Sequence, residues 1–150
     1  MKVNTKYFGP VEIDEEELLL FEHGIPGFED KRCYFMAKYT AEAPFYILQS
    51  VDEPGPAFIL IGLEQVAPGY SIELTEEVVT ELKLNQPEEA TVYAIVTIPG
   101  ELAKATVNLA APLVINTRGK LGKQIILNNP SYGMKHPLFS GEQAPVEAVK

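Results

Sequence analysis

The sequence of 150 residues has little of what a redox, metal or membrane function would need. Its only cysteine is Cys33, which makes an internal disulfide impossible, and it has two histidines and no tryptophan. No apolar run approaches the roughly 18 residues that a membrane-spanning helix requires. The first residues, MKVNT, lack the basic and then apolar layout of a signal peptide. Together these absences favour a cytoplasmic protein.

The motifs of common enzyme classes are also missing. The chain has no phosphate-binding glycine loop, no Cys-x-x-Cys pair, no His-Glu-x-x-His motif and no Gly-x-Ser-x-Gly turn. The best metal ligands it offers are His23 and His136, and two histidines without located carboxylates are a weak signal. We therefore expect no catalytic residue, no cofactor and no metal. The alternative is a small-molecule-binding or metal-dependent hydrolytic β-barrel, which needs a pocket with convergent polar groups.

Negative charge dominates the chain and is unevenly distributed. The net charge is −9, of which residues 1–103, with 19 acidic and 6 basic side chains, carry −13. Residues 104–150, with 2 acidic and 6 basic side chains, carry +4. An acidic body repels the phosphates of nucleic acids and attracts basic partners. We therefore expect protein partners, and no direct binding to nucleic acid or to a membrane.

Short apolar or alternating runs separated by turn signals fill most of the chain. Many short strands between glycine- and proline-rich turns predict a mainly β protein, a small antiparallel β-barrel-like single domain. We expect this domain to span residues 1–139, a length sufficient for a substantial core without disulfides or metals. Residues 140–150 show no periodic apolar pattern, which predicts a loosely ordered tail. The clearest turn signals are Gly9-Pro10, Gly24 to Gly27, Pro54 to Pro56, Pro99-Gly100 and Asn128 to Pro130.

One segment reads as a helix instead. The stretch LTEEVVTELKLN predicts a short helix near residues 75–83, with Thr75 as the N-cap and Glu76 and Glu77 at the positive end of the helix dipole. Apolar residues recur at helical spacing, at Val78, Val79 and Leu82. We expect Glu76, Glu77 and Glu81 at mostly exposed positions. They form either an ordinary solvated surface or a face for a basic partner.

The stretch TVNLAAPLVIN, residues 106–116, alternates between apolar odd-numbered and more polar even-numbered positions. This period predicts a strand whose odd face meets the core and whose even face meets water or a partner. Pro112 cannot donate a ladder hydrogen bond, so this is either an edge or two strands meeting at a bend near residues 110–112. Asn108 and Asn116 then either bond the backbone around the break or face a partner. We favour the structural role, because asparagine beside a strand break commonly bonds nearby backbone.

Four more polar residues are candidates for structural or partner contacts. Gln49 and Gln124 each border an apolar strand, as a buried bridge or as an interface contact. Tyr132 and His136 lie four residues apart before Pro137, and we expect them to pack the chain end onto the barrel or to contact a partner. The candidate partner-binding residues are Glu76, Glu77, Glu81, Asn108, Asn116, Gln124, Tyr132 and His136.

Several stretches, in one fixed order, resemble a known family. The most specific are the pattern NL-x-AP-x-x-x-N, the G-x-Q that follows it, and then Y-x-x-x-H-P-L. On these stretches, which cover about residues 1–139, the chain resembles the FliW family of bacterial flagellar assembly factors. The full set is FEHGIPGFED at 21–30, FYILQSVD at 45–52, AFILI at 57–61, YSIELTEEVVTELKL at 70–84, TVNLAAPLVINT at 106–117, GKQIILNN at 122–129 and YGMKHPLF at 132–139.

The resemblance implies a small β-barrel-like protein that is not an enzyme and acts by binding. FliW-like proteins bind CsrA, an RNA-binding translational repressor, and prevent it from silencing messages that include the flagellin message. They also bind newly made flagellin, in the manner of a chaperone. Secretion of flagellin would free the protein to capture CsrA, which makes it a partner switch. A structural piece of the flagellum is a further alternative, which the lack of a coiled-coil segment disfavours.

Overall fold

The computed structural model describes residues 1–39, 44–67, 69–70, 72–129 and 131–138. The predicted loosely ordered tail, residues 140–150, lies outside the described residues. Within the described ranges, no helix is long and apolar enough to cross a membrane.

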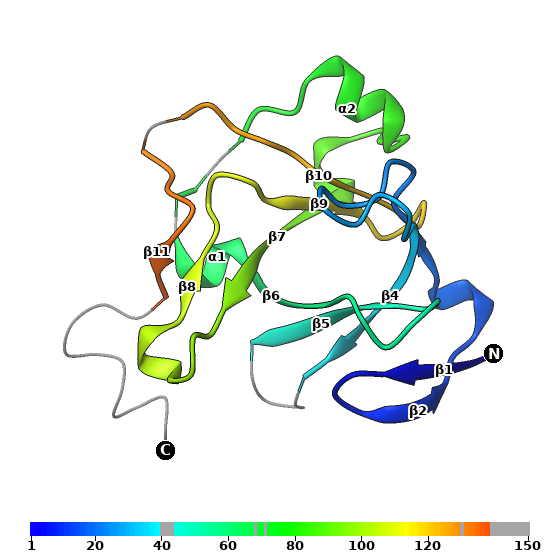
Figure 1. The fold of residues 1–150 in the computed structure, drawn as a ribbon. Coiled ribbons are helices and arrows are strands. Elements are labelled where there is room, and N and C mark those ends of the chain that lie inside the picture. Colours follow the sequence, from blue (N-terminus) through cyan, green and yellow to red (C-terminus); the bar gives the residue numbers. More distant parts are fainter. Residues whose placement is uncertain (40–43, 68, 71, 130, 139–150) are drawn as a thin grey trace.

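The centre of the fold is a closed barrel of seven strands, which confirms the predicted mainly β barrel class (Figure 1). Strand β9 pairs with both β10 and β7 and so closes the ring. All neighbouring strands of the barrel run antiparallel except β10 and β3, which meet in parallel at Leu121 and Leu20. The strands are β3 (Leu19–Leu20), β4 (Cys33–Lys38), β5 (Phe45–Ser50), β6 (Ala57–Gly62), β7 (Ala90–Thr97), β9 (Leu113–Asn116) and β10 (Leu121–Gln124).

Shorter elements lie outside this ring. The strands β1 (Lys2–Thr5) and β2 (Gly9–Glu12) form a separate hairpin, whereas β8 (Thr106–Val107) extends the sheet from β7. Strand β11 (His136–Pro137) pairs with β8 near the end of the described chain. Among the described residues, the helical elements are α1 (Leu63–Val66), α2 (Glu76–Glu81) and three single 3-10 turns, η1 (Glu15–Glu17), η2 (Pro87–Glu89) and η3 (Leu102–Lys104).

Apolar side chains fill the barrel interior. The rings of Phe21 and Tyr34 are both fully buried and meet edge to face, with centroids 5.3 Å apart. Burial raises the pKa of the Tyr34 hydroxyl to about 12, and this hydroxyl has no hydrogen-bond partner among the described residues. The buried interior cluster consists of Leu19, Phe21, Ile25, Tyr34, Leu48, Leu60, Leu113 and Ile115.

Three peripheral layers cover the outside of the barrel, so several strands are buried on both faces. Val3 of β1 and Ile13, the residue after β2, cover Phe35 of β4. Helix α1, β8 and the segment that carries Tyr132 and Leu138 cover the outer faces of β6 and β7. Helix α2 and the residues around it cover the outer face of β9 and part of β10, on the side opposite the hairpin (Figure 1). Its buried cluster is Val78, Leu82, Leu84, Val114 and Leu121.

The predicted helix near residues 75–83 is confirmed as α2. Thr75 is its N-cap, with the side-chain Oγ1 accepting a hydrogen bond of 3.2 Å from the backbone N of Val78. The helix ends before Lys83, whose φ of 54° is left-handed and turns the chain back toward the barrel. The single turn of α1 adds helix that the sequence pattern did not predict.

The stretch 106–116 is two strands that meet at a bend. Between β8 and β9, Oδ1 of Asn108 accepts hydrogen bonds from the backbone N of Ala110 (3.0 Å) and of Ala111 (3.1 Å), so the structural role favoured for Asn108 holds. The odd-numbered face is buried as predicted. The even-numbered face is buried too from Pro112 to Asn116, rather than facing water or a partner, because α2 packs over Val114.

Candidate functional site

The three glutamates of α2 have different surroundings. Glu76 and Glu77, in the first turn, are exposed as predicted. Glu81 is only 22% exposed, and its Oε2 accepts a hydrogen bond of 2.6 Å from Nζ of Lys123 on β10. The same oxygen lies 3.6 Å from Nε2 of His23. Glu76 and Glu77 are therefore available to a partner, whereas Glu81 connects α2 to the barrel.

The Glu81 contact predicts a component of stability that depends on pH. The hydrogen bond from Lys123 lowers the pKa of Glu81 below its ordinary value of 4.5 in the folded protein. Because the folded pKa lies below the unfolded one, the contribution is present above the unfolded value and is lost as the pH falls through the folded value. We expect Glu81→Gln to reduce the free energy of unfolding near neutral pH, with a difference from the parent protein that shrinks under acid.

The measurement is urea unfolding of both proteins between about pH 7 and about pH 3. Glu76→Gln is the control, because Glu76 is an exposed carboxylate on the same helix. A Glu81→Gln difference that stays constant across this range would contradict the ion-pair account.

Asparagine and glutamine side chains bridge buried backbone. Asn116 is 3% exposed; its Nδ2 donates to the Leu82 carbonyl (2.8 Å), and its Oδ1 accepts from the N of Arg118 (3.1 Å) and of Gly119 (3.0 Å). Thus the structural alternative holds for Asn116, which has almost no surface left for a partner. Gln49 and Gln124 act similarly: Gln49 is 1% exposed and bonds Lys6 and Pro54, and half-buried Gln124 donates to the Ala111 carbonyl.

The two candidates near the chain end have different roles. Tyr132 is half-buried, with its ring centroid 4.4 Å from that of Tyr70, and it packs against the cluster over β6 and β7. His136 is exposed on β11, opposite Val107 of β8. His23 lies on another element, beside Glu81. Among the residues that the structure describes, no three His, Cys, Asp or Glu side chains form a group that could hold a metal ion.

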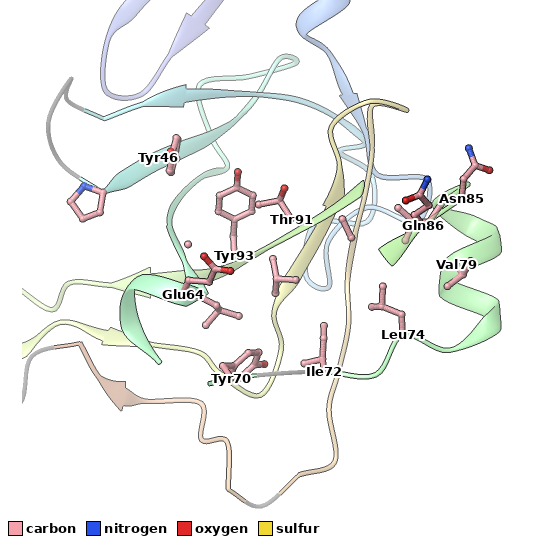
Figure 2. A pocket seen from close by; sticks show the side chains of 16 residues that line it. Tyr46, Glu64, Tyr70, Ile72, Leu74, Val79, Asn85, Gln86, Thr91 and Tyr93 are labelled. Atoms are coloured by element: carbon pink, nitrogen blue, oxygen red, sulfur yellow. The ribbon is translucent and has the colours of Figure 1, made fainter. Parts of the chain in front are cut away.

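A groove of about 870 Å³ lies between α1 and α2 (Figure 2). The beginning of β7, residues 90–93, contributes its floor together with Gly62 of β6. Glu64 of α1 and Tyr70 line one side, and Tyr46 of β5 extends the lining toward the barrel rim. On the other side the lining comes from the approach to α2, from α2 itself and from the turn after it, namely Ile72, Leu74, Val79, Leu84, Asn85 and Gln86.

Tyrosines dominate the aromatic surface of this groove. The rings of Tyr46 and Tyr93 meet edge to face with centroids 5.7 Å apart, and burial, with a smaller effect of Tyr46, raises the pKa of Tyr93. The hydroxyl of Tyr70 donates to the Leu109 carbonyl at 2.8 Å, and burial raises its pKa to about 12. The hydroxyls of Tyr70 and Tyr93 therefore stay protonated near neutral pH.

Glu64 is the one charged side chain among the described residues that line the groove. A lone carboxylate beside protonated tyrosines forms neither a nucleophile–base pair nor a split acid–base pair. Apolar side chains with a few polar ones are typical of a binding surface. The arrangement therefore has the character of a binding surface. No single sequence motif predicts this groove, because its lining residues are scattered between positions 44 and 93.

Comparison with known proteins finds relatives that match this chain over nearly all of its described residues, in sequence and in structure. A family model described as FliW protein matches residues 2–138. The flagellar assembly factor FliW of Clostridium botulinum (strain 657 / Type Ba4) is 39% identical over 142 residues, which are 95% of this chain and 99% of the relative. That of Geobacillus kaustophilus (strain HTA426) is 42% identical over 139 residues, 93% and 96% of the two chains. A crystal structure of the flagellar assembly factor FliW superposes with a TM-score of 0.89 at 39% identity, covering 95% of this chain and 99% of that one.

Proposed function

Because the chain belongs to the FliW family of flagellar assembly factors, we propose that it works in the cytoplasm by binding two proteins, CsrA and flagellin. Capture of CsrA, a translational repressor, relieves the repression of flagellin synthesis. Flagellin is a competing or coupled partner, so that free flagellin returns CsrA to its messages. In this role the protein is a regulator and chaperone, and it catalyses no reaction.

The observation that carries this proposal is the family match, which extends over nearly all of the described barrel. Charge supports it independently. CsrA binds RNA and so presents basic surface, and a chain of net charge −9 attracts such a partner over distance. Glu76 and Glu77 are exposed at the start of α2, next to the groove, and are the first candidates for the contact. Gln124, Tyr132 and His136 remain predicted contacts for either partner.

The experiment that tests the proposal measures the binding of purified CsrA to the immobilised protein as the salt concentration rises, and then as flagellin is added. We expect the association rate and the affinity to fall with salt, because screening weakens the attraction between opposite charges. We also expect flagellin to reduce the amount of CsrA bound. Failure of CsrA to bind at any salt concentration would reject the proposal.

Charge reversal at the start of α2 tests the acidic helix face. The double substitution Glu76→Lys/Glu77→Lys is expected to weaken CsrA binding by about tenfold, mostly through slower association. The control, Glu15→Lys/Glu16→Lys, makes the same change in net charge at exposed positions of η1. Equal affinity of the two double variants would remove this face from the interface.

A further inference from the structure

We propose that the groove between α1 and α2 is a docking site for a peptide segment that carries a lysine or arginine next to an apolar side chain. This inference rests on the proposed function, because it assigns the segment to the basic partner, CsrA, rather than to flagellin. It goes beyond that function by naming the surface and the chemistry of recognition.

The shape of the groove fits an extended segment better than a compact small molecule. Its volume of about 870 Å³ accommodates several side chains. A small-molecule site gathers its polar groups at one place. Here Glu64 and the Asn85–Gln86 pair lie toward opposite ends of the groove (Figure 2). The distance between these groups favours a ligand that runs along the groove and meets them in turn.

The stretch between these ends is apolar. Ile72, Leu74 and Val79 are each half-buried, as is Val92 on the floor, so their remaining surface faces the groove. Figure 2 shows Leu74 and Val79 on the side formed by α2 and its approach. Exposed apolar surface gathered in a concave site is typical of a place where a partner inserts an apolar side chain.

The end of the groove at Glu64 is suited to a cation. Glu64, exposed on α1, supplies its carboxylate, and Tyr46 and Tyr93 supply aromatic rings to the same lining (Figure 2). A lysine or arginine pairs with a carboxylate and is attracted to aromatic faces. Because the described lining holds no basic side chain, a carboxylate from a partner would find no counter-charge there.

The charges around α2 also favour a positively charged ligand. Residues 72–91 contain six glutamates and one lysine, Lys83. Within the described chain Lys123 pairs with Glu81, and Arg118 with Glu89, at 3.3 Å. The other four, Glu73, Glu76, Glu77 and Glu88, are all exposed. These four carboxylates lie on the same segments that supply Ile72, Leu74, Val79 and Gln86 to the lining, so they repel an acidic segment and attract a basic one. The charge near the groove therefore favours a basic occupant.

Two substitutions at exposed positions test the groove with little risk to the fold. Glu64→Lys reverses the one charge among the described residues that line the groove. Thr91→Trp fills it from the floor, and tryptophan suits a strand as well as threonine does. The controls are Glu16→Lys, which makes the same charge change on η1, and Thr97→Trp, which places the same ring at an exposed position of β7 outside the groove. Circular dichroism and melting temperatures verify that all four variants fold.

Binding of each variant to purified CsrA and to purified flagellin is then compared. We expect both groove variants to lose at least about tenfold in affinity for CsrA, while both controls stay within about twofold of the parent protein. Parent-like CsrA binding by both groove variants would overturn the inference and leave the proposed function standing. Loss of flagellin binding alone would overturn it as well, because the occupant would then be the wrong partner.

Selection of peptides tests the groove even if neither protein binds, an outcome that would reject the proposed function by itself. Short random peptides displayed on phage are selected on the parent protein and counter-selected on the Thr91→Trp variant. We expect the retained peptides to carry lysine or arginine beside a large apolar residue and to lose binding to Glu64→Lys. Retained peptides that are acidic, or none that discriminate the two proteins, would overturn the inference.

Discussion

Replacing Gly122 with alanine is expected to destabilise the barrel by about 3 kcal/mol. Gly122 lies in β10, where an added Cβ would stand 2.4 Å from Cζ of Phe21 and 2.7 Å from both of its Cε atoms. Phe21 is fully buried and packed edge to face against Tyr34, so the ring cannot withdraw without opening the interior. The free energy of unfolding in urea, followed by far-ultraviolet circular dichroism, measures the loss.

Two further variants separate this clash from the general cost of replacing glycine. Gly133→Ala is the matched control, since an added Cβ there meets no atom within 4 Å, and we expect a change within about 0.5 kcal/mol. Phe21→Leu removes the ring that blocks the methyl group. We expect the double variant, Phe21→Leu with Gly122→Ala, to lose less stability than the sum of the losses in the two single variants. The expected difference is about 1 kcal/mol or more. Additive losses would show that the two residues do not share this space.

Local sequence pattern was sufficient for the β-barrel class and for helix α2, but not for helix α1. The alternation of apolar residues and the spacing of glycine and proline predicted a barrel-like β domain, and a single N-cap, Thr75, located the start of α2. The pattern did not show what covers each strand. The even-numbered face of residues 106–116 reads as open to water or a partner, yet Val114 packs under Val78 and Leu82 of the α2 region. The burial of this face depends on contacts between β9 and α2, which are distant in the sequence. The alternation of residues within one strand cannot predict such contacts.

The sequence likewise predicted some features of the candidate site and not others. Asparagine beside a strand break predicted a backbone partner for Asn108 and Asn116, and both have one. For Asn116 that partner is the carbonyl of Leu82, 34 residues earlier, so nothing near the break could identify it. The groove was missed because its lining comes from three strands, two helices and the segments around them. Its one local signal is the run of glutamates with interleaved apolar residues in 72–91, of which the predicted helix face includes Glu76, Glu77 and Glu81 alone.

Replacing Asn116 with alanine is expected to cost about 2–3 kcal/mol of stability, because the buried Leu82 carbonyl loses its hydrogen bond. The backbone N–H groups of Arg118 and Gly119 lose a partner as well, but both residues are exposed and water can replace it. Urea unfolding measures the total loss. Hydrogen exchange of the amides in α2 locates it, since the helix should lose protection before the barrel does. Asn128→Ala, at an exposed position, is the control.

Asn116→Asp decides which of the hydrogen bonds matters. Aspartate keeps an oxygen that accepts from Arg118 and Gly119, but it cannot donate to Leu82 and would place a carboxylate against that carbonyl. We therefore expect Asn116→Asp to lose at least as much stability as Asn116→Ala. Parent-like stability of the aspartate variant would mean that the turn contacts carry the effect.

Because Val79 of α2 lines the groove, a loosened helix also moves part of the groove wall. If CsrA docks in the groove as proposed, both variants bind it more weakly, although neither substitution alters a side chain that lines the groove.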